Sequence, residues 1–343
     1  MVMATGALAR IRSGFPEAQI VCGMRPYLQP LVSNSPYFDD VLSMPKESGW
    51  GAVSSFVSQV AAVRSGRFDL AIVLPNSQIT GWVVRLAGVR WRLGYQQGRP
   101  GTMNLGLRAE VNRGLFARRI GPRRVPTPMP EYYDTLLDVI NLPPTPVGAR
   151  LQTSDAERSG VSEYLANHGI DPQGNLVLLN AGASFGPSKL WVAERWVELA
   201  RHYQSIGMIP IFLSGPNETS MVRAIAAAAG VHGMTDPVRS LGMLKALFER
   251  ARLLVSTDTG PRHLGVWMHV PTVCLMGPND RRYTDYALDR QIVIQKDLEC
   301  VPCQRKVCPL GTRQCMLDIT VAEVVEAGER MMVQAVRNPS SSS

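Results

Sequence analysis

The sequence predicts an α/β protein of two doubly wound domains that face a cleft. Short β-rich runs alternate with amphipathic helical stretches in the first half, and the same alternation restarts after residue 150. Strands that alternate with helices favour a parallel sheet covered on both faces. With 343 residues, 45% of them apolar, the chain is long enough for two domains with cores of their own.

Each half carries its own series of expected elements. In the first half these are a strand, a helix, a buried strand and a helix, at 18–22, 53–63, 68–74 and 78–88. In the second half strands alternate with helices and a terminal helix follows, with the strands at 175–180, 208–214, 252–256 and 271–276 and helices at 193–203, up to 229, and 320–336.

A proline-rich break separates the two halves. Pro143, Pro144 and Pro146 make this segment stiff and unsuited to a helix or strand. We therefore expect one domain at 1–145, a second at 150–335 and a disordered tail at 336–343.

Charge and hydropathy narrow the class of protein. Lysine and arginine outnumber aspartate and glutamate by 36 to 28, and the net charge of +8 suits anionic partners such as nucleotides, phosphorylated glycolipids, membrane faces or nucleic acid. No apolar run approaches the roughly 20 residues that span a bilayer, and no signal peptide is evident at the N-terminus. We expect a cytoplasmic protein. Nucleic acid is not an expected partner, because the basic residues are not interleaved with aromatic ones.

One strand–loop–helix unit in the second half carries the strongest functional signal. Asp258, Thr259 and Gly260 follow a buried strand, and Pro261 suits the first helical position. Amides at such a helix start favour a phosphate, and the glycine lets a ligand approach the backbone. Because Asp258 would repel a phosphate, we expect it to bind a hydroxyl or to cap the helix. His263 is either a donor to a phosphate or sugar oxygen or a packing residue.

Two other loops are expected at the same edge, because ligands of doubly wound sheets lie beyond the carboxyl ends of the strands. Lys189, in the loop 181–189, can meet a diphosphate as a point charge, or it is a solvated surface lysine. Glu218, in the turn 215–218, can accept hydrogen bonds from sugar hydroxyls, or it complements a helix dipole. The sequence therefore predicts that three loops converge on a sugar-linked pyrophosphate.

Four cysteines lie close together near the C-terminus, at positions 300, 303, 308 and 315. Cys300, Cys303, Cys308 and Cys315 supply four thiolates, the number that a tetrahedral structural zinc requires. Two disulfides or four free thiols in a packed loop are the alternatives. No histidine lies near them in the sequence, so a catalytic role is not expected.

The order of these motifs resembles the ADP-heptose:lipopolysaccharide heptosyltransferases of glycosyltransferase family 9, most closely the heptosyltransferase II type. The resemblance extends to about residue 335. It rests on segments of both halves, at 15–18, 74–77, 92–95, 180–191, 215–218, 256–264, 270–278 and 300–315.

The resemblance implies a GT-B fold of two Rossmann-like domains and an inverting transfer that requires no cofactor. The first domain would take the lipid A–core glycolipid and the second ADP-L-glycero-β-D-manno-heptose, at the inner face of the cytoplasmic membrane. Lys189 would contact the diphosphate, and Glu218 would lie near the ribose or heptose. Asp258, Thr259, Gly260 and His263 would line the phosphate and sugar.

The sequence departs from the family at its start. Family members place a strand and a Gly-Asp pair before the segment that corresponds to 2–5, and their aspartate is the expected base. We expect that base upstream of Met1, with the start assigned too far downstream or the sequence a fragment. If the chain were complete as written, we would expect impaired folding and little or no transfer. A non-catalytic remnant that binds a nucleotide sugar, a GT-B enzyme with another nucleotide sugar and a nucleic-acid-binding protein remain as alternatives.

Overall fold

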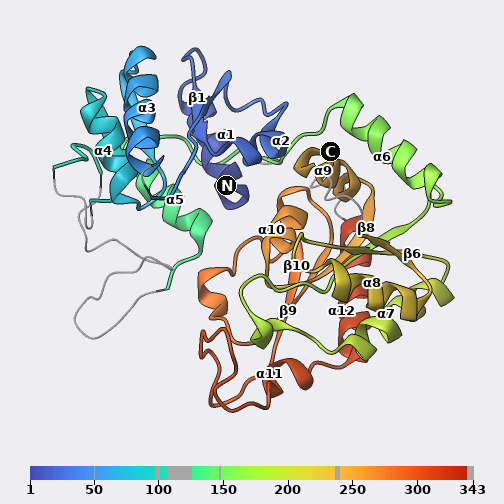
Figure 1. The fold of residues 1–343 in the computed structure, drawn as a ribbon. Helices are drawn as coiled ribbons and strands as arrows, with labels where there is room; N and C mark the ends of the chain where they lie inside the picture. The colour runs from blue at the N-terminus through green and yellow to red at the C-terminus, as the bar shows by residue number, and fades with distance from the viewer. Residues whose placement is uncertain (50, 97–100, 107–125, 147, 236–239, 338–343) are drawn as a thin grey trace.

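The computed structural model describes residues 1–49, 51–96, 101–106, 126–146, 148–235 and 240–337 (Figure 1). The elements fall into two groups, one built from the first half of the chain and one from the second (Figure 1). None of the described helices is both long enough and apolar enough to cross a bilayer.

The N-terminal half is built from short strands and helices. Its strands are β1 Val21–Met24, β2 Asp40–Ser43, β3 Leu70–Val73 and β4 Trp91–Gly94. Its helices are η1 Val2–Ala4, α1 Thr5–Gly14, η2 Pro26–Leu28, α2 Gln29–Val32, α3 Gly51–Ser65, α4 Gln78–Leu86 and α5 Met129–Asp138.

The strands of this half form two small parallel sheets. β1 pairs with β2 from Val21 opposite Asp40, and β3 pairs with β4 from Leu70 opposite Trp91. The alternation predicted a parallel sheet here, and both pairs are parallel, but among the described residues they form two separate sheets. A continuous sheet needs a strand that hydrogen-bonds to both pairs, and no described strand does so.

The C-terminal half contains one six-stranded parallel sheet. Its strands are β5 Leu176–Asn180, β6 Ile209–Leu213, β7 His232–Met234, β8 Ala251–Thr257, β9 Thr272–Met276 and β10 Gln291–Gln295. The spatial order is β10-β9-β8-β5-β6-β7, so the chain builds outward from β5 in one direction and then crosses back to build outward from β8. This order is that of a doubly wound nucleotide-binding sheet, as the alternation predicted.

Successive side chains along a strand point to opposite faces of the six-stranded sheet, and both faces of this sheet are apolar. Leu176, Leu178 and Leu254 belong to one buried cluster, and Val177 and Val255 to the other. The first face is covered by α6 Asp155–Asn167, α9 Leu241–Glu249 and α10 Gly260–Trp267. The second is covered by α7 Ala193–Ser205, α8 Thr219–Ala229 and α12 Val321–Arg337. Short helices η5 Pro187–Lys189, η6 Arg281–Tyr283 and α11 Gln314–Leu317 complete this half.

The two halves share buried surface. Leu31 and Val32 on α2 belong to the same apolar cluster as Phe248 on α9 and Leu264 on α10. A cavity of about 210 Å³ also lies between the halves. Its lining comes from α1, α5 and the linker on one side and from α10 and the segment before β10 on the other, including Gly6, Ala7, Asp134, Thr145, Trp267, Tyr286 and Arg290.

The proline-rich linker is held against the first helix. The guanidinium of Arg10 donates to the carbonyl oxygens of Leu142 and Pro143, at 2.8 and 2.6 Å.

The predicted tail needs one correction, because α12 continues to Arg337 and so includes Val336. The rest of that tail, 338–343, lies outside the described residues.

Candidate functional site

The point at which the six-stranded sheet changes direction lies between β5 and β8. Neighbouring strands whose connections leave in opposite directions open a crevice beyond their carboxyl ends. The loop after β5 carries Lys189, and the loop after β8 carries Asp258. Both predicted residues therefore lie at the place where such sheets bind ligands.

Asp258 is the centre of a buried ionic cluster. It is 5% exposed, and its Oδ1 accepts a hydrogen bond from Arg262 at 2.7 Å. Its Oδ2 accepts one from Lys189 at 3.0 Å and one from Asn279 at 2.5 Å. The expectation that Asp258 caps the helix is wrong, because both carboxylate oxygens are occupied by these partners.

The cluster has a net positive charge. Burial alone raises the pKa of the Asp258 carboxyl, but the charges of Arg262 and Lys189 hold that pKa well below its usual range. The carboxylate is therefore ionised at neutral pH beside two cations. One surplus positive charge remains in a site with little access to water, and an anionic ligand would balance it.

The start of α10 is open. Thr259 is its N-cap, no side chain caps the helix, and Pro261 lies in the first turn. Thr259 Oγ1 instead accepts a hydrogen bond from Asn180 on β5, at 2.8 Å. A methyl group added at Gly260 would meet no atom within 4 Å. Free amides and free space in front of them make this helix start suited to a phosphate.

Lys189 is fixed in place. It is 5% exposed, and its ammonium donates to both the carbonyl and the carboxylate of Asp258. The ammonium also lies 4.8 Å from the centre of the Phe185 ring. Lys189 is therefore not a solvated surface lysine.

Glu218 reaches the same region through Gly182. Its carboxylate lies against Gly182 so closely that an added Cβ there would stand 2.0 Å from Oε2. The carbonyl of Gly182 accepts a hydrogen bond from Thr257, the residue before Asp258, at 2.5 Å. The three predicted loops thus meet at one edge of the sheet.

His263 is held in its neutral form. Burial is the main reason why its pKa falls to about 3, and the neighbouring Arg262 charge lowers it further. Nδ1 is paired with the hydroxyl of Tyr286 at 2.8 Å. A neutral imidazole at this position can exchange a hydrogen bond with a ligand without adding charge.

Sequence reasoning missed two residues of the cluster. Arg262 is fully buried, and it bonds to Gln291 and Thr284 as well as to Asp258. The only signal in the sequence was the spacing of four residues between Asp258 and Arg262, and Asp258 lies in the bend just before α10 rather than on the helix. Asn279 lies in the loop after β9, and no local pattern indicated it.

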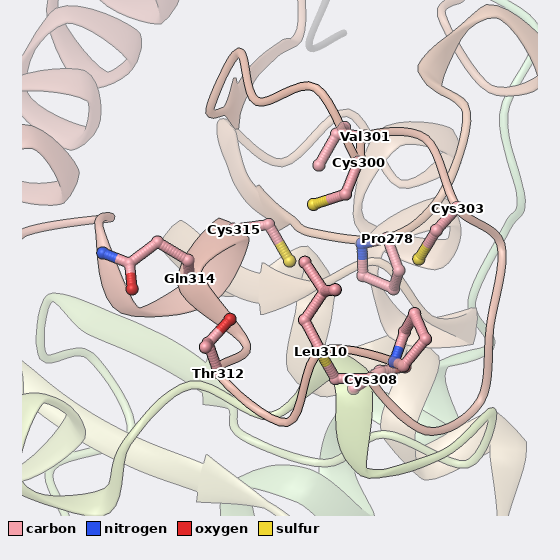
Figure 2. Close-up of a pocket in the computed structure, with 11 residues that line it drawn as sticks. Pro278, Cys300, Val301, Cys303, Cys308, Leu310, Thr312, Gln314 and Cys315 are labelled. Carbon is pink, nitrogen blue, oxygen red and sulfur yellow. The ribbon is translucent and has the colours of Figure 1, made fainter.

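The four cysteines line one pocket (Figure 2). All four thiols are free. The amide of Arg313 donates to the sulfur of Cys308 at 3.4 Å and lowers the pKa of that thiol, whereas burial raises the pKa of Cys315. Among the described residues, no group of three or more His, Cys, Asp or Glu is placed so that it could hold a metal ion. Zinc at this position stays a prediction.

The cysteine loop supports the loop that carries Lys189. Ser188 donates through its hydroxyl to the carbonyl of Arg305 at 2.6 Å and through its amide to that of Lys306 at 3.1 Å. Gly186 lies so close to Lys306 that a Cβ would stand 2.5 Å from its carbonyl oxygen. A displacement of the cysteine loop would therefore be transmitted to Lys189.

Comparison with known proteins gives a consistent result. Residues 57–313 match the family model described as glycosyltransferase family 9 (heptosyltransferase). The chain is 23% identical over 342 residues to lipopolysaccharide heptosyltransferase 2 of Escherichia coli, a match that covers 97% of this chain and 95% of that protein.

Solved structures share the fold. The glycosyltransferase family 9 protein of Veillonella parvula superposes with a TM-score of 0.80 at 21% identity, over 97% of this chain and 93% of that one. The E. coli ADP-heptose lipopolysaccharide heptosyltransferase II superposes with a TM-score of 0.76 at 21% identity, over 98% and 96%. The fold is thus the GT-B type that the sequence predicted.

Proposed function

This chain belongs to glycosyltransferase family 9, the heptosyltransferases, and we propose that it transfers a heptose from ADP-L-glycero-D-manno-heptose to the inner core of lipopolysaccharide. The observation that carries the donor assignment is the open start of α10 above the Lys189–Asp258–Arg262 cluster. Uncapped amides and one surplus positive charge fit a nucleoside diphosphate.

We propose the following roles for the predicted residues. The backbone amides at the start of α10 and the ammonium of Lys189 bind the diphosphate and stabilise the negative charge that builds on the departing ADP. Glu218, beside Gly182, accepts hydrogen bonds from hydroxyls of the ribose or heptose. His263 contributes a neutral imidazole to a phosphate or sugar oxygen.

Arg262 and Asn279 act on the ligand through Asp258. They hold its carboxylate, and the carboxylate in turn orients the ammonium of Lys189. The base that deprotonates the acceptor is not assigned to any residue of this chain.

The acceptor and the stereochemistry are inferred from the family. We propose that a lipid A–core glycolipid is bound by the N-terminal half, that transfer inverts the anomeric centre and that it needs no cofactor. Transfer that is unchanged in a chelator such as EDTA would support the last point, and recovery of lost activity by an added divalent cation would contradict it.

The direct test is a transfer assay with ADP-heptose and heptose-deficient lipopolysaccharide. Mass spectrometry should show an acceptor heavier by one heptose residue, and ADP should be released in equal amount. Binding of ADP-heptose by calorimetry without this product would favour a non-catalytic nucleotide-sugar-binding protein. Transfer from UDP-glucose or GDP-mannose, but not from ADP-heptose, would favour a GT-B enzyme of another specificity.

A further inference from the structure

Six large apolar side chains on neighbouring elements of the N-terminal half are exposed to solvent. They are 43% to 64% exposed and come from α3, α4 and the start of β4. We call them the apolar face, which consists of Val53, Val57, Ile79, Trp82, Leu86 and Trp91. Large apolar side chains grouped in this way on a surface mark an interaction site more often than single ones do.

The apolar face comes largely from two helices that pack together. α3 packs against α4, and Arg64 near the end of α3 donates to the carbonyl of Leu86 at the end of α4, at 2.6 Å. The two helices therefore end side by side. Val57 and Ile79 each lie seven residues before these ends, about 10 Å along the helices at 1.5 Å per residue. Ile79, Trp82 and Leu86 are spaced three and four residues apart and therefore follow one stripe of α4.

Exposed arginines lie on the same segment of the chain as the apolar face. Residues 51–96 contain five arginines and no lysine, and Asp69 is the one acidic residue among them. Arg64, Arg67, Arg85 and Arg90 are exposed, and neither α3 nor α4 contains an acidic residue. The guanidinium of Arg90 lies 5.3 Å from the centre of the Trp91 ring. An apolar surface with a positive rim is complementary to lipid chains below anionic headgroups.

We propose that the apolar face rests on an anionic lipid bilayer, with Trp82, Leu86 and Trp91 in the interfacial layer and the arginines on the headgroups. Tryptophan and arginine both combine an apolar body with a polar end, as this layer requires. The inference rests on the proposed function, since a membrane-bound glycolipid acceptor requires the N-terminal half to meet the membrane. α3 and α4 lie on the side of that half away from the six-stranded sheet (Figure 1), so a membrane against them leaves the donor site open.

The test uses the whole chain with two kinds of vesicle, phosphatidylcholine alone and phosphatidylcholine mixed with phosphatidylglycerol. Sedimentation should recover the protein with the mixed vesicles at low salt, and high salt should release most of it. The variants R85Q/R90Q and W82Q/L86Q should each bind the mixed vesicles about tenfold or more weakly. Matched controls elsewhere on the surface, R201Q on α7 and V336Q on α12, should bind like the wild type.

Further measurements distinguish a lipid bilayer from a second copy of the chain as the partner of the apolar face. They also separate this inference from the proposed heptose transfer. Brominated lipids should quench the emission of the wild type more than that of W82F. Equal vesicle binding by wild type and face variants would overturn the proposal, as would a dimer in ultracentrifugation that W82Q/L86Q converts to monomer. ADP affinity should be the same in all these variants. Vesicle binding without heptose transfer would leave this inference standing and refute the proposed function.

Discussion

The ammonium of Lys189 lies 3.0 Å from Oδ2 of Asp258, so the cation that we assign to the diphosphate is itself held by a buried carboxylate. The side chain cannot swing freely, because it also donates to the Asp258 carbonyl at 2.7 Å. Binding of a diphosphate then costs little ordering of the lysine, and the arrangement is set before the ligand arrives.

Replacing Lys189 by methionine should weaken ADP binding by about tenfold to a hundredfold, the range for a hydrogen bond to a charged group. The length of the side chain is kept while the charge and its donors are lost. Calorimetry with ADP measures the effect. Lys306→Met, on an exposed lysine in the neighbouring loop, should leave the affinity unchanged. Equal affinity for both variants would show that Lys189 does not meet the diphosphate.

Replacing Asp258 by asparagine should lower the free energy of unfolding by about 3–5 kcal/mol, because two buried cations lose their counter-ion. Denaturant titration by circular dichroism measures this loss. The control is Asp289→Asn, which removes an exposed carboxylate 3.5 Å from Arg290 and should cost at most about 1 kcal/mol. A small effect of the Asp258 change would mean that water reaches the cluster.

Replacing Gly260 by leucine should block ADP without unfolding the protein. The backbone at Gly260 needs no positive φ, and a Cβ there meets open space, which is where we expect the phosphate. The melting temperature should stay within a few degrees, and ADP affinity should fall more than about tenfold. Gly160→Leu is the matched control, because this helical glycine on α6 also has room for a side chain.

The free energy of unfolding should fall as the pH drops below 6.5. The pKa of His263 is about 3 in the folded protein against 6.5 ordinarily, so the unfolded state takes up the proton first. This stabilising contribution is complete above pH 6.5 and is lost as the pH falls toward 3. Asp258 acts in the same direction at still lower pH, since its pKa is also depressed. His263→Gln should reduce the slope by up to about 1.36 kcal/mol per pH unit.

Denaturant titrations of both proteins at a series of pH values measure these slopes. Identical slopes for the wild type and His263→Gln would show that His263 takes up its proton equally well in the folded protein.

The cysteines should differ in their reaction with iodoacetamide under reducing conditions. Cys308 should react early, because an amide hydrogen bond lowers the pKa of its thiol. Cys274 should resist until the protein unfolds, because burial raises the pKa of its thiol to about 12. Peptide mass spectrometry at short times gives the order. Protection of all four cysteines between 300 and 315, released by a chelator, would contradict free thiols and support the predicted zinc.

The sequence predicted the C-terminal half better than the N-terminal half, and the physical reason is burial. β5 and β8 are buried along nearly their whole length and read as continuous apolar runs between glycine-rich loops. β2 and β4, four residues each and only partly buried, gave no such signal and were missed. The predicted strand at 18–22 overlaps β1, which begins three residues later and ends two residues later, at Val21–Met24.

Within the site, the sequence indicated which loops converge but not which side chains pair. Lys189, Glu218 and Asp258 could be named because each follows a strand of the parallel sheet. The pairing of Lys189 with Asp258 joins residues 69 positions apart, and the contact of Asn279 with Asp258 depends on the placement of β9 beside β8. Such partners depend on strand order, which local patterns do not specify.

The apolar cluster that joins Leu31 and Val32 to Phe248 and Leu264 limits how independently the halves can behave. Separating them would uncover side chains that neither half can bury alone, so the described parts should melt cooperatively in one step. Any closing motion that accompanies catalysis should accordingly be a small sliding of packed helices rather than a wide hinge opening.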